Sequence, residues 1–201
     1  MGVSLPLSAA IASTDIVTRP QVNDPDRQMI EQCLSGHPQG FRGLYQRHQQ
    51  RVRSLLFQLC GAVALDDLVQ EVFLRAWKGL KSLKHEAKFS TWLYRIAWNV
   101  ACDYRRQLAT RKSRHQQYLY QSEPLTPGLD LRQLHYEDLV QRGLATLPLE
   151  YRSVLVMHDL QGLPQKEIAE ILRIPVGTVK SRLFRARSTL RTYFTEAGVS
   201  L

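Results

Sequence analysis

A helical period, running from residue 25 almost to the end of the chain, is the feature that most constrains what this sequence can fold into. Apolar residues recur every three or four positions, the spacing that places them on one face of an α-helix. The strict alternation of apolar and polar residues that marks a β-strand is nearly absent. We therefore expect an all-α protein. The predicted helices span 25–34, 39–60, 66–80, 90–110, 128–147, 148–161, 165–172 and 176–194.

The positive charge of the chain is concentrated in two blocks. The 201 residues carry a net charge of +9. Residues 25–115 hold 16 basic and 7 acidic residues, and residues 144–201 hold 8 and 5. A mildly acidic, turn-rich stretch separates them, which predicts two small helical domains on a flexible linker and favours a polyanionic partner. The expected divisions are a flexible tail at 1–24, a first domain at 25–115, a linker at 116–129 and a second domain at 130–201.

The sequence lacks the motifs of membrane-spanning, secreted and common catalytic proteins. It has no run of about 18 apolar residues, and its first 24 residues lack the basic start of a signal peptide. Three cysteines without a CxxC pair argue against a disulfide framework and a zinc site. There is no P-loop, HExxH or GxSxG, and the six histidines are scattered. We therefore expect a cytoplasmic protein without catalysis, metal, cofactor or membrane insertion.

The segment from 165 to 191 has the pattern of a helix-turn-helix. The small Ala169 allows two helices to approach closely, Pro175 ends the first helix, and Thr178 can help to start the second. Arg173 stands at the turn position where glycine is common. A helical wheel of the second helix predicts one buried face, made of Val176, Val179, Leu183, Ala186 and Leu190.

The opposite face of that second helix carries basic residues around an aromatic one. Phe184 is unusual on a solvated face but suits a face that contacts bases, and arginine can read guanine. The N-terminal part of such a helix enters the major groove. The alternative is an ordinary helical hairpin with a basic solvated face. We expect base contacts from Lys180, Ser181, Phe184 and Arg185, phosphate contacts from Arg182, Arg187 and Arg191, and Thr178 on the flank.

A second basic surface is predicted on the helix of residues 90–110. The wheel places Trp92, Asn99 and Arg106 opposite the apolar stripe, and a tryptophan beside amide and guanidinium groups suits an unpaired base. Arg105 and its basic neighbours suit phosphates. The alternative is that Trp92 belongs to the core and the basic residues are only solvated. The preceding loop adds three basic residues that fit either interpretation, Lys84, His85 and Lys88.

An acidic patch interrupts this basic domain. Asp67, Gln70 and Glu71 lie off the apolar stripe of the helix at 66–80. Acidic side chains are poorly suited to phosphate and well suited to a protein partner that carries basic groups. Acidic residues at a helix start also complement the helix dipole, which explains Asp67 but not Gln70.

Four segments in this order resemble the sigma-70 superfamily, and more closely its extracytoplasmic-function (ECF, group IV) RNA polymerase sigma factors. They are DDLVQEVFLRAW, FSTWLYRIAWNVACDYRR, LPLEYRSVLVMHDLQGLPQKEIAEIL and VGTVKSRLFRAR. The resemblance covers about 25–115 and 130–194. It implies a region 2-like and a region 4-like domain that act with bacterial core RNA polymerase and promoter DNA, and it points to an anti-sigma factor as a further partner.

The resemblance also implies a role for each surface. The helix with Asp67, Gln70 and Glu71 matches the segment that docks on the clamp helices of the polymerase β′ subunit, and the β flap is a further contact. The 82–106 segment matches the part that recognises and opens the −10 element. The implied −10 residues are Lys84, His85, Lys88, Phe89, Ser90, Trp92, Asn99, Arg105 and Arg106. The implied −35 residues are Thr178, Lys180, Ser181, Arg182, Phe184, Arg185 and Arg187.

Two other functions stay open when the residues are considered alone. A DNA recombinase or nuclease with a C-terminal helix-turn-helix would nick or transfer strands without polymerase. A dimeric repressor or activator would bind duplex DNA tightly by itself. A sigma factor, in contrast, would bind DNA weakly alone and initiate transcription at promoters when it is combined with core polymerase.

Overall fold

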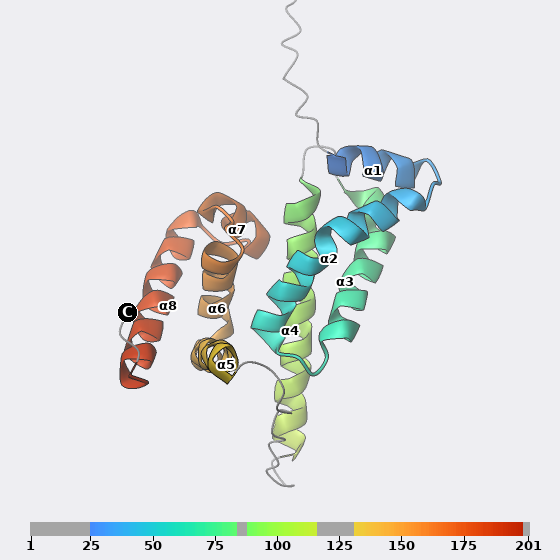
Figure 1. Ribbon diagram of the computed structural model, residues 1–201. Helices are drawn as coiled ribbons and strands as arrows, with labels where there is room; N and C mark the ends of the chain where they lie inside the picture. Colours follow the sequence, from blue (N-terminus) through green and yellow to red (C-terminus); the bar gives the residue numbers. More distant parts are fainter. Residues whose placement is uncertain (1–24, 84–87, 116–130, 199–201) are drawn as a thin grey trace, which may run out of the picture.

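The computed structural model describes residues 25–83, 88–115 and 131–198, and all regular structure in these ranges is helical (Figure 1). This confirms the all-α prediction. A 3-10 turn at Leu80–Ser82 follows α3, and a π-helical turn at Val156–Leu160 continues α6. The helices are α1 (Pro25–Leu34), α2 (Gln39–Cys60), α3 (Leu65–Gly79), α4 (Phe89–His115), α5 (Leu131–Thr146), α6 (Leu149–Leu155), α7 (Gln165–Leu172) and α8 (Val176–Glu196).

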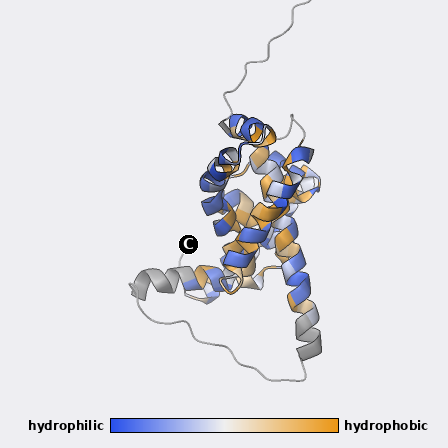
Figure 2. Cartoon of the chain, turned by 90° about the vertical axis from the view of Figure 1, so that its right-hand side faces the viewer, coloured by the Kyte–Doolittle hydropathy of each residue, from blue (hydrophilic) through white to orange (hydrophobic). Residues whose placement is uncertain are grey.

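Helices α1 to α4 form one bundle, built around the apolar stripes of α2, α3 and α4. Leu55 and Leu56 of α2, Val72 of α3 and Leu93 of α4 are fully buried in it. Because such residues recur at helical spacing, hydrophobic and hydrophilic residues alternate along the helices of the bundle (Figure 2). Burial of these side chains, each worth about 1.5–3 kcal/mol, supplies the main stabilising free energy of the bundle.

A polar pair holds α1 against α2 inside this bundle. His48 Nε2 and Asp26 Oδ2 lie 2.8 Å apart, and both residues are buried. Buried polar groups need partners, and Asp26 also forms an ion pair with Arg47 of α2 at 3.3 Å. The helices also approach closely at Gly40, where a Cβ atom would lie 2.3 Å from the carbonyl oxygen of Met29. A side chain at position 40 would therefore push α1 away from α2.

Helices α5 to α8 form the second group, whose core lies between α6, α7 and α8. Val154, Met157, Ile168 and Val179 are completely buried there. The turn between α7 and α8 closes when the backbone N–H of Ile174 donates to the carbonyl oxygen of Ala169, at 3.1 Å. This is the helix-turn-helix that the sequence predicts, and the close packing around a small residue is the reason that it forms.

The two groups of helices pack directly on each other (Figure 1). Helix α7 lies against α4, while α6 and the π-helical turn lie against α2. The predicted tail at 1–24 and linker at 116–129 fall outside the described residues. Among the helices that are described, none has the length and the apolar character that a membrane crossing requires.

Two helix starts differ by one residue from the sequence-based expectation. Helix α3 begins at Leu65, one residue before the predicted start, so Asp66 lies inside the first turn and pairs with Arg53 of α2. Helix α4 begins at Phe89, one residue before the predicted start, so Ser90 and Thr91 both lie inside it. In both cases tertiary packing of an apolar residue at the helix start extends the helix beyond the polar residue that local preference would choose.

Arg173 adopts the left-handed conformation, with φ 55° and ψ 48°, at the turn of the helix-turn-helix. For a residue with a Cβ atom, the left-handed conformation costs about 1–2 kcal/mol of folding free energy. Glycine avoids this steric cost but loses more backbone entropy on folding. We predict that Arg173→Gly raises the free energy of unfolding by roughly 0.5–1 kcal/mol. Urea unfolding measures the change. Arg173→Ala is the matched control, because it removes the side chain and keeps the strain, so equal effects of both changes would contradict the explanation.

Candidate nucleic-acid interface

The exposed face of α8 is set by what the opposite face buries. Val179, Leu183 and Ala186 pack into the second core with at most 2% exposure. Side chains on the far side of the helix therefore point to solvent, and Phe184 is 76% exposed there. The remaining residues predicted to read bases are also exposed, namely Lys180, Ser181 and Arg185.

Two arginines of this region, Arg185 on the face and Arg187 on its flank, have polar or acidic partners. Arg187 donates from Nε and Nη2 to the carboxylate of Asp159, at 2.9 and 2.6 Å. These hydrogen bonds hold the pKa of Asp159 below its usual value, although burial opposes the shift. Arg185 donates to the hydroxyl of Tyr151 at 3.3 Å. Such contacts orient the guanidinium groups before any ligand arrives. Thr178 and Arg182 are half-buried on the other flank.

The exposed face of α4 is narrower than the sequence predicts. Asn99 and Arg106 are exposed, and Lys88 is exposed just before the helix. Ser90 is half-buried. Trp92 is also half-buried, because its ring packs against Gly79, where an added Cβ would lie 3.1 Å from the indole. The ring of Trp92 therefore belongs partly to the core and partly to the surface, which combines the two interpretations that the sequence left open.

Two of the implied −10 residues have structural contacts in place of an exposed surface. Phe89 is only 1% exposed, and its ring lies 5.2 Å from that of His48 and 5.8 Å from that of Trp92. Its position at the start of a buried stripe makes it a core residue, so the expectation that its side chain faces DNA does not fit the structure. Arg105 is half-buried and donates to the carbonyl oxygen of Leu59 at 3.1 Å. Lys84 and His85 lie outside the described residues.

The predicted acidic patch is at the surface of α3. Asp67 and Gln70 are exposed, and Glu71 is partly exposed. Glu71 accepts a hydrogen bond from Arg75 at 2.7 Å, and Arg75 also donates to Asp103 of α4 at 3.1 Å. This network fixes Glu71 in place and leaves the other two side chains available to a partner.

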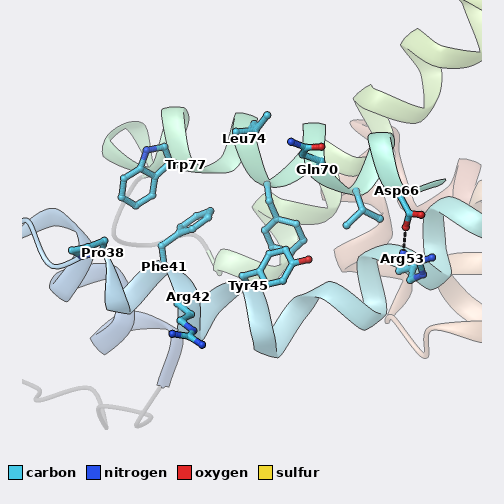
Figure 3. Close-up of a pocket in the computed structure, with 11 residues that line it drawn as sticks. Pro38, Phe41, Arg42, Tyr45, Arg53, Asp66, Gln70, Leu74 and Trp77 are labelled. Atoms are coloured by element: carbon cyan, nitrogen blue, oxygen red, sulfur yellow. Dashed lines mark hydrogen bonds and ion pairs between the residues drawn. The ribbon is translucent and has the colours of Figure 1, made fainter. Parts of the chain in front are cut away.

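An apolar groove of about 690 Å³ runs beside this patch, between α2 and α3 (Figure 3). Tyr45, Leu74 and Trp77 line it and are 38–45% exposed, and Gln70 stands at its edge. None of these three residues is among those predicted from the sequence. The sequence does contain a sign of an exposed apolar surface: Leu74 and Trp77 are apolar, lie three positions apart and fall outside the buried stripe of α3. An exposed apolar surface of this kind marks an interaction site.

The chain matches known proteins over both groups of helices. The family models for Sigma-70 region 2 and Sigma-70, region 4 match residues 44–111 and 137–190. The ECF RNA polymerase sigma-E factors of Haemophilus influenzae and Escherichia coli are each 32% identical over 175 residues, which is 82% of this chain and 93% and 92% of theirs. The chain belongs to the ECF sigma factors. It is therefore an RNA polymerase sigma factor, a class of protein that binds core polymerase and promoter DNA.

Solved structures show the same fold. CnrH, solved in complex with the cytosolic domain of CnrY, matches at 26% identity with a TM-score of 0.67, over 86% of this sigma factor and 99% of that chain. The sigma factor RpoE of Bartonella quintana, solved in complex with the anti-sigma factor NepR, matches at 23% identity with a TM-score of 0.62, over 77% of this chain and 96% of that one. The two-domain sigma-factor fold is thus the architecture of this chain.

The ion pair between Asp159 and Arg187 predicts a pH-dependent effect on stability. A carboxyl whose pKa is lowered by folding stabilises the folded state at pH values above its ordinary pKa of 3.8. This contribution is lost as the pH falls through the lower pKa that the carboxyl has in the folded protein. We expect Asp159→Asn to lower the free energy of unfolding by about 0.5 kcal/mol at pH 7. Urea unfolding of the wild-type protein and the variant from pH 7 to pH 3 measures this difference. The two free energies of unfolding should converge below about pH 4. A constant difference would contradict the assignment.

Proposed function

We propose that this ECF sigma factor directs promoter-specific initiation through three separate surfaces. The exposed face of α8 reads the −35 duplex, the exposed face of α4 with the 82–90 segment captures the opened −10 element, and the groove and acidic patch of α3 dock on the clamp helices of the β′ subunit. The observation that carries the proposal is Phe184, a 76% exposed aromatic ring among basic residues on a helix whose other face is buried.

Support for the −35 assignment comes from how the side chains of α8 divide into two kinds. Lys180 and Ser181 surround Phe184 without anchoring ion pairs among the described residues, so they are available to base edges. Arg187, in contrast, is held by Asp159, and a cation fixed beside the helix suits the phosphate backbone. Base-reading residues lie at the centre and phosphate-binding residues at the rim, as major-groove recognition requires.

Support for the −10 assignment comes from the exposed polar groups of α4. Asn99 offers an amide to a base edge, and Arg106 offers a cation to a phosphate. Trp92 offers the part of its ring that is not packed on Gly79. Opening of the duplex is then a binding process, because contacts to the released single strand offset the lost base pairing and stacking.

Support for polymerase docking comes from two kinds of complementarity on neighbouring surfaces. The groove offers the apolar side chains of Tyr45, Leu74 and Trp77, and the patch offers Asp67 and Gln70. A paired-helix partner with apolar and basic residues satisfies both surfaces together. The clamp helices of β′ are the proposed partner, because the resemblance matches the helix with Asp67, Gln70 and Glu71 to the segment that docks on them. Region 4 is proposed to contact the β flap on the same ground.

Three further aspects belong to the same proposal. The protein acts by binding and not by catalysis. It acts in the cytoplasm, where bacterial polymerase and promoter DNA are found. An anti-sigma factor is proposed as an additional partner, and the similar CnrH, solved with the cytosolic domain of CnrY, shows that this fold can be held by a second protein.

Arg185→Ala tests the −35 surface. The change removes one guanidinium from the proposed base-reading face, and we expect promoter binding through the −35 element to weaken by about 1–3 kcal/mol. Transcription with core polymerase from promoters with an intact or a scrambled −35 element measures the loss. Arg27→Ala, an exposed arginine on α1, controls for the loss of one charge. Promoter selectivity equal to that of the wild-type protein would show that α8 presents a different face to DNA.

Leu74→Ser tests the groove. A hydroxyl in place of an isobutyl group removes apolar contact area from a docking surface, and we expect affinity for core polymerase to fall about tenfold. Competition binding against a labelled wild-type protein measures this. Val63→Ser is the matched control, because Val63 is 97% exposed but lies outside the groove. Equal affinities of the two variants would exclude the groove as the docking site.

A further inference from the structure

Three arginines of α8 meet side chains that come from α6 and from the π-helical turn at its end. The pairs are Arg182 with Glu150, Arg185 with Tyr151 and Arg187 with Asp159. Helix α6 packs directly against α8, so these side chains reach the arginines from the buried side of the helix (Figure 1). None of the DNA contacts predicted from the sequence lies on α6. The arginines are thus oriented by a helix outside the predicted DNA surface.

Arg185 differs from the other two arginines in the charge of its partner. Glu150 and Asp159 are carboxylates, which compete with DNA for a cation. Arg185 forms no ion pair with a described carboxylate, and its Nη1 donates to the neutral hydroxyl of Tyr151 at 3.3 Å. A guanidinium group has about five N–H donors, and a guanine edge needs about two of them. The tyrosine therefore fixes the group and leaves its charge and most of its donors to DNA.

The hydroxyl of Tyr151 is held at a fixed point of the second group of helices. The tyrosine is half-buried and packs against the core, and its backbone N–H donates to the carbonyl oxygen of Pro148 at 3.0 Å. The next residue, Arg152, is buried and donates to the carbonyl oxygens of Leu147 and Leu59 at 3.3 and 3.4 Å. The start of α6 is therefore tied down on both sides of the ring.

A held arginine reads a base at a lower entropic cost than a free one. Arg185 is exposed, and a long exposed side chain has many rotamers that a bound base must reduce to one. A two-bond contact with guanine also requires the planar guanidinium group to lie in the plane of the base. An anchor for Arg185 thus strengthens the contacts that this side chain makes, and it changes the preference for one base pair more than the general affinity for DNA.

We propose that Tyr151 is a specificity-determining positioning residue, whose hydroxyl holds Arg185 in the orientation that reads a guanine of the −35 element. This inference rests on the −35 surface proposed above and extends it to a second helix. Part of the −35 preference of this sigma factor is then encoded at the start of α6, outside the helix that enters the major groove.

Tyr151→Phe tests the role of the hydroxyl, because it keeps the ring in the core. Holoenzyme made from the full-length variant and core polymerase is bound, in competition, to fragments of a promoter that the wild-type holoenzyme uses, with each −35 base pair changed in turn. The base pair read by Arg185 is the one whose preference Arg185→Ala removes. We expect Tyr151→Phe to lower the preference at that base pair about three- to tenfold and to leave the others unchanged.

Tyr193→Phe is the matched control. Tyr193 is a half-buried tyrosine of α8 whose ring contacts that of Phe194, away from the predicted reading face. This variant should keep every −35 preference of the wild-type protein. A loss in Tyr151→Phe that is equal at all base pairs would overturn the inference, because it would show a general weakening of the second group of helices.

The double variant Tyr151→Phe, Arg185→Ala distinguishes positioning from direct contact. If Tyr151 acts through Arg185, the double variant loses no more preference than Arg185→Ala alone. Losses that add would show that the tyrosine hydroxyl contacts DNA itself, and the positioning role would then be wrong.

A measurement without DNA tests the anchor directly. In the free full-length protein, NMR order parameters of the arginine Nε–H groups report how strongly each side chain is ordered. We expect Tyr151→Phe to lower the order parameter of Arg185 and to leave that of Arg187 unchanged, because Asp159 holds Arg187. An Arg185 side chain that is equally ordered in both proteins would contradict the inference.

The outcomes separate this inference from the proposed function. An Arg185→Ala holoenzyme with unchanged preference at every −35 base pair would overturn the −35 assignment, and the role of Tyr151 with it. A preference that Arg185→Ala removes and Tyr151→Phe leaves intact would overturn the role of Tyr151 alone.

Discussion

Burial of one apolar stripe of α4 is the constraint on which the rest of this structure depends. Leu93, Ala97 and Val100 pack against α2 and α3 with at most 2% exposure. Because a helix cannot rotate without removing such a stripe from the core, this packing also fixes where Asn99 points and which face is offered to α7. The first core, the proposed −10 surface and the contact between the two groups of helices thus follow from the orientation of a single helix.

The two proposed DNA surfaces differ in how freely they are presented. The −35 face of α8 is exposed around Phe184, whereas the start of α4 lies against Glu167 and the turn after Gln161. The contact between the two groups of helices also includes Arg152, which is buried, forms no ion pair with a described carboxylate and donates to the carbonyl oxygens of Leu59 and Leu147.

The sequence predicts most of the fold because periodic apolar residues leave few alternatives. The helix-turn-helix and the exposed Phe184 follow directly from a helical wheel. The resemblance places Phe89 among the −10 residues, but its ring is buried, because burial at the start of a helix depends on its tertiary neighbours, among them His48. The groove around Trp77 and the contact between Thr91 and Glu167 join residues from separate helices, so no pattern within one helix can show them.

The central claim is that this chain gives core RNA polymerase its choice of promoter. The most direct test is transcription in vitro with purified bacterial core polymerase and genomic DNA, with the start sites mapped with and without the protein. The account predicts a small set of new start sites that share one −35 and one −10 sequence and that appear only when the protein is added. Start sites that do not change on its addition, or nicking of the DNA by the protein alone, would contradict it.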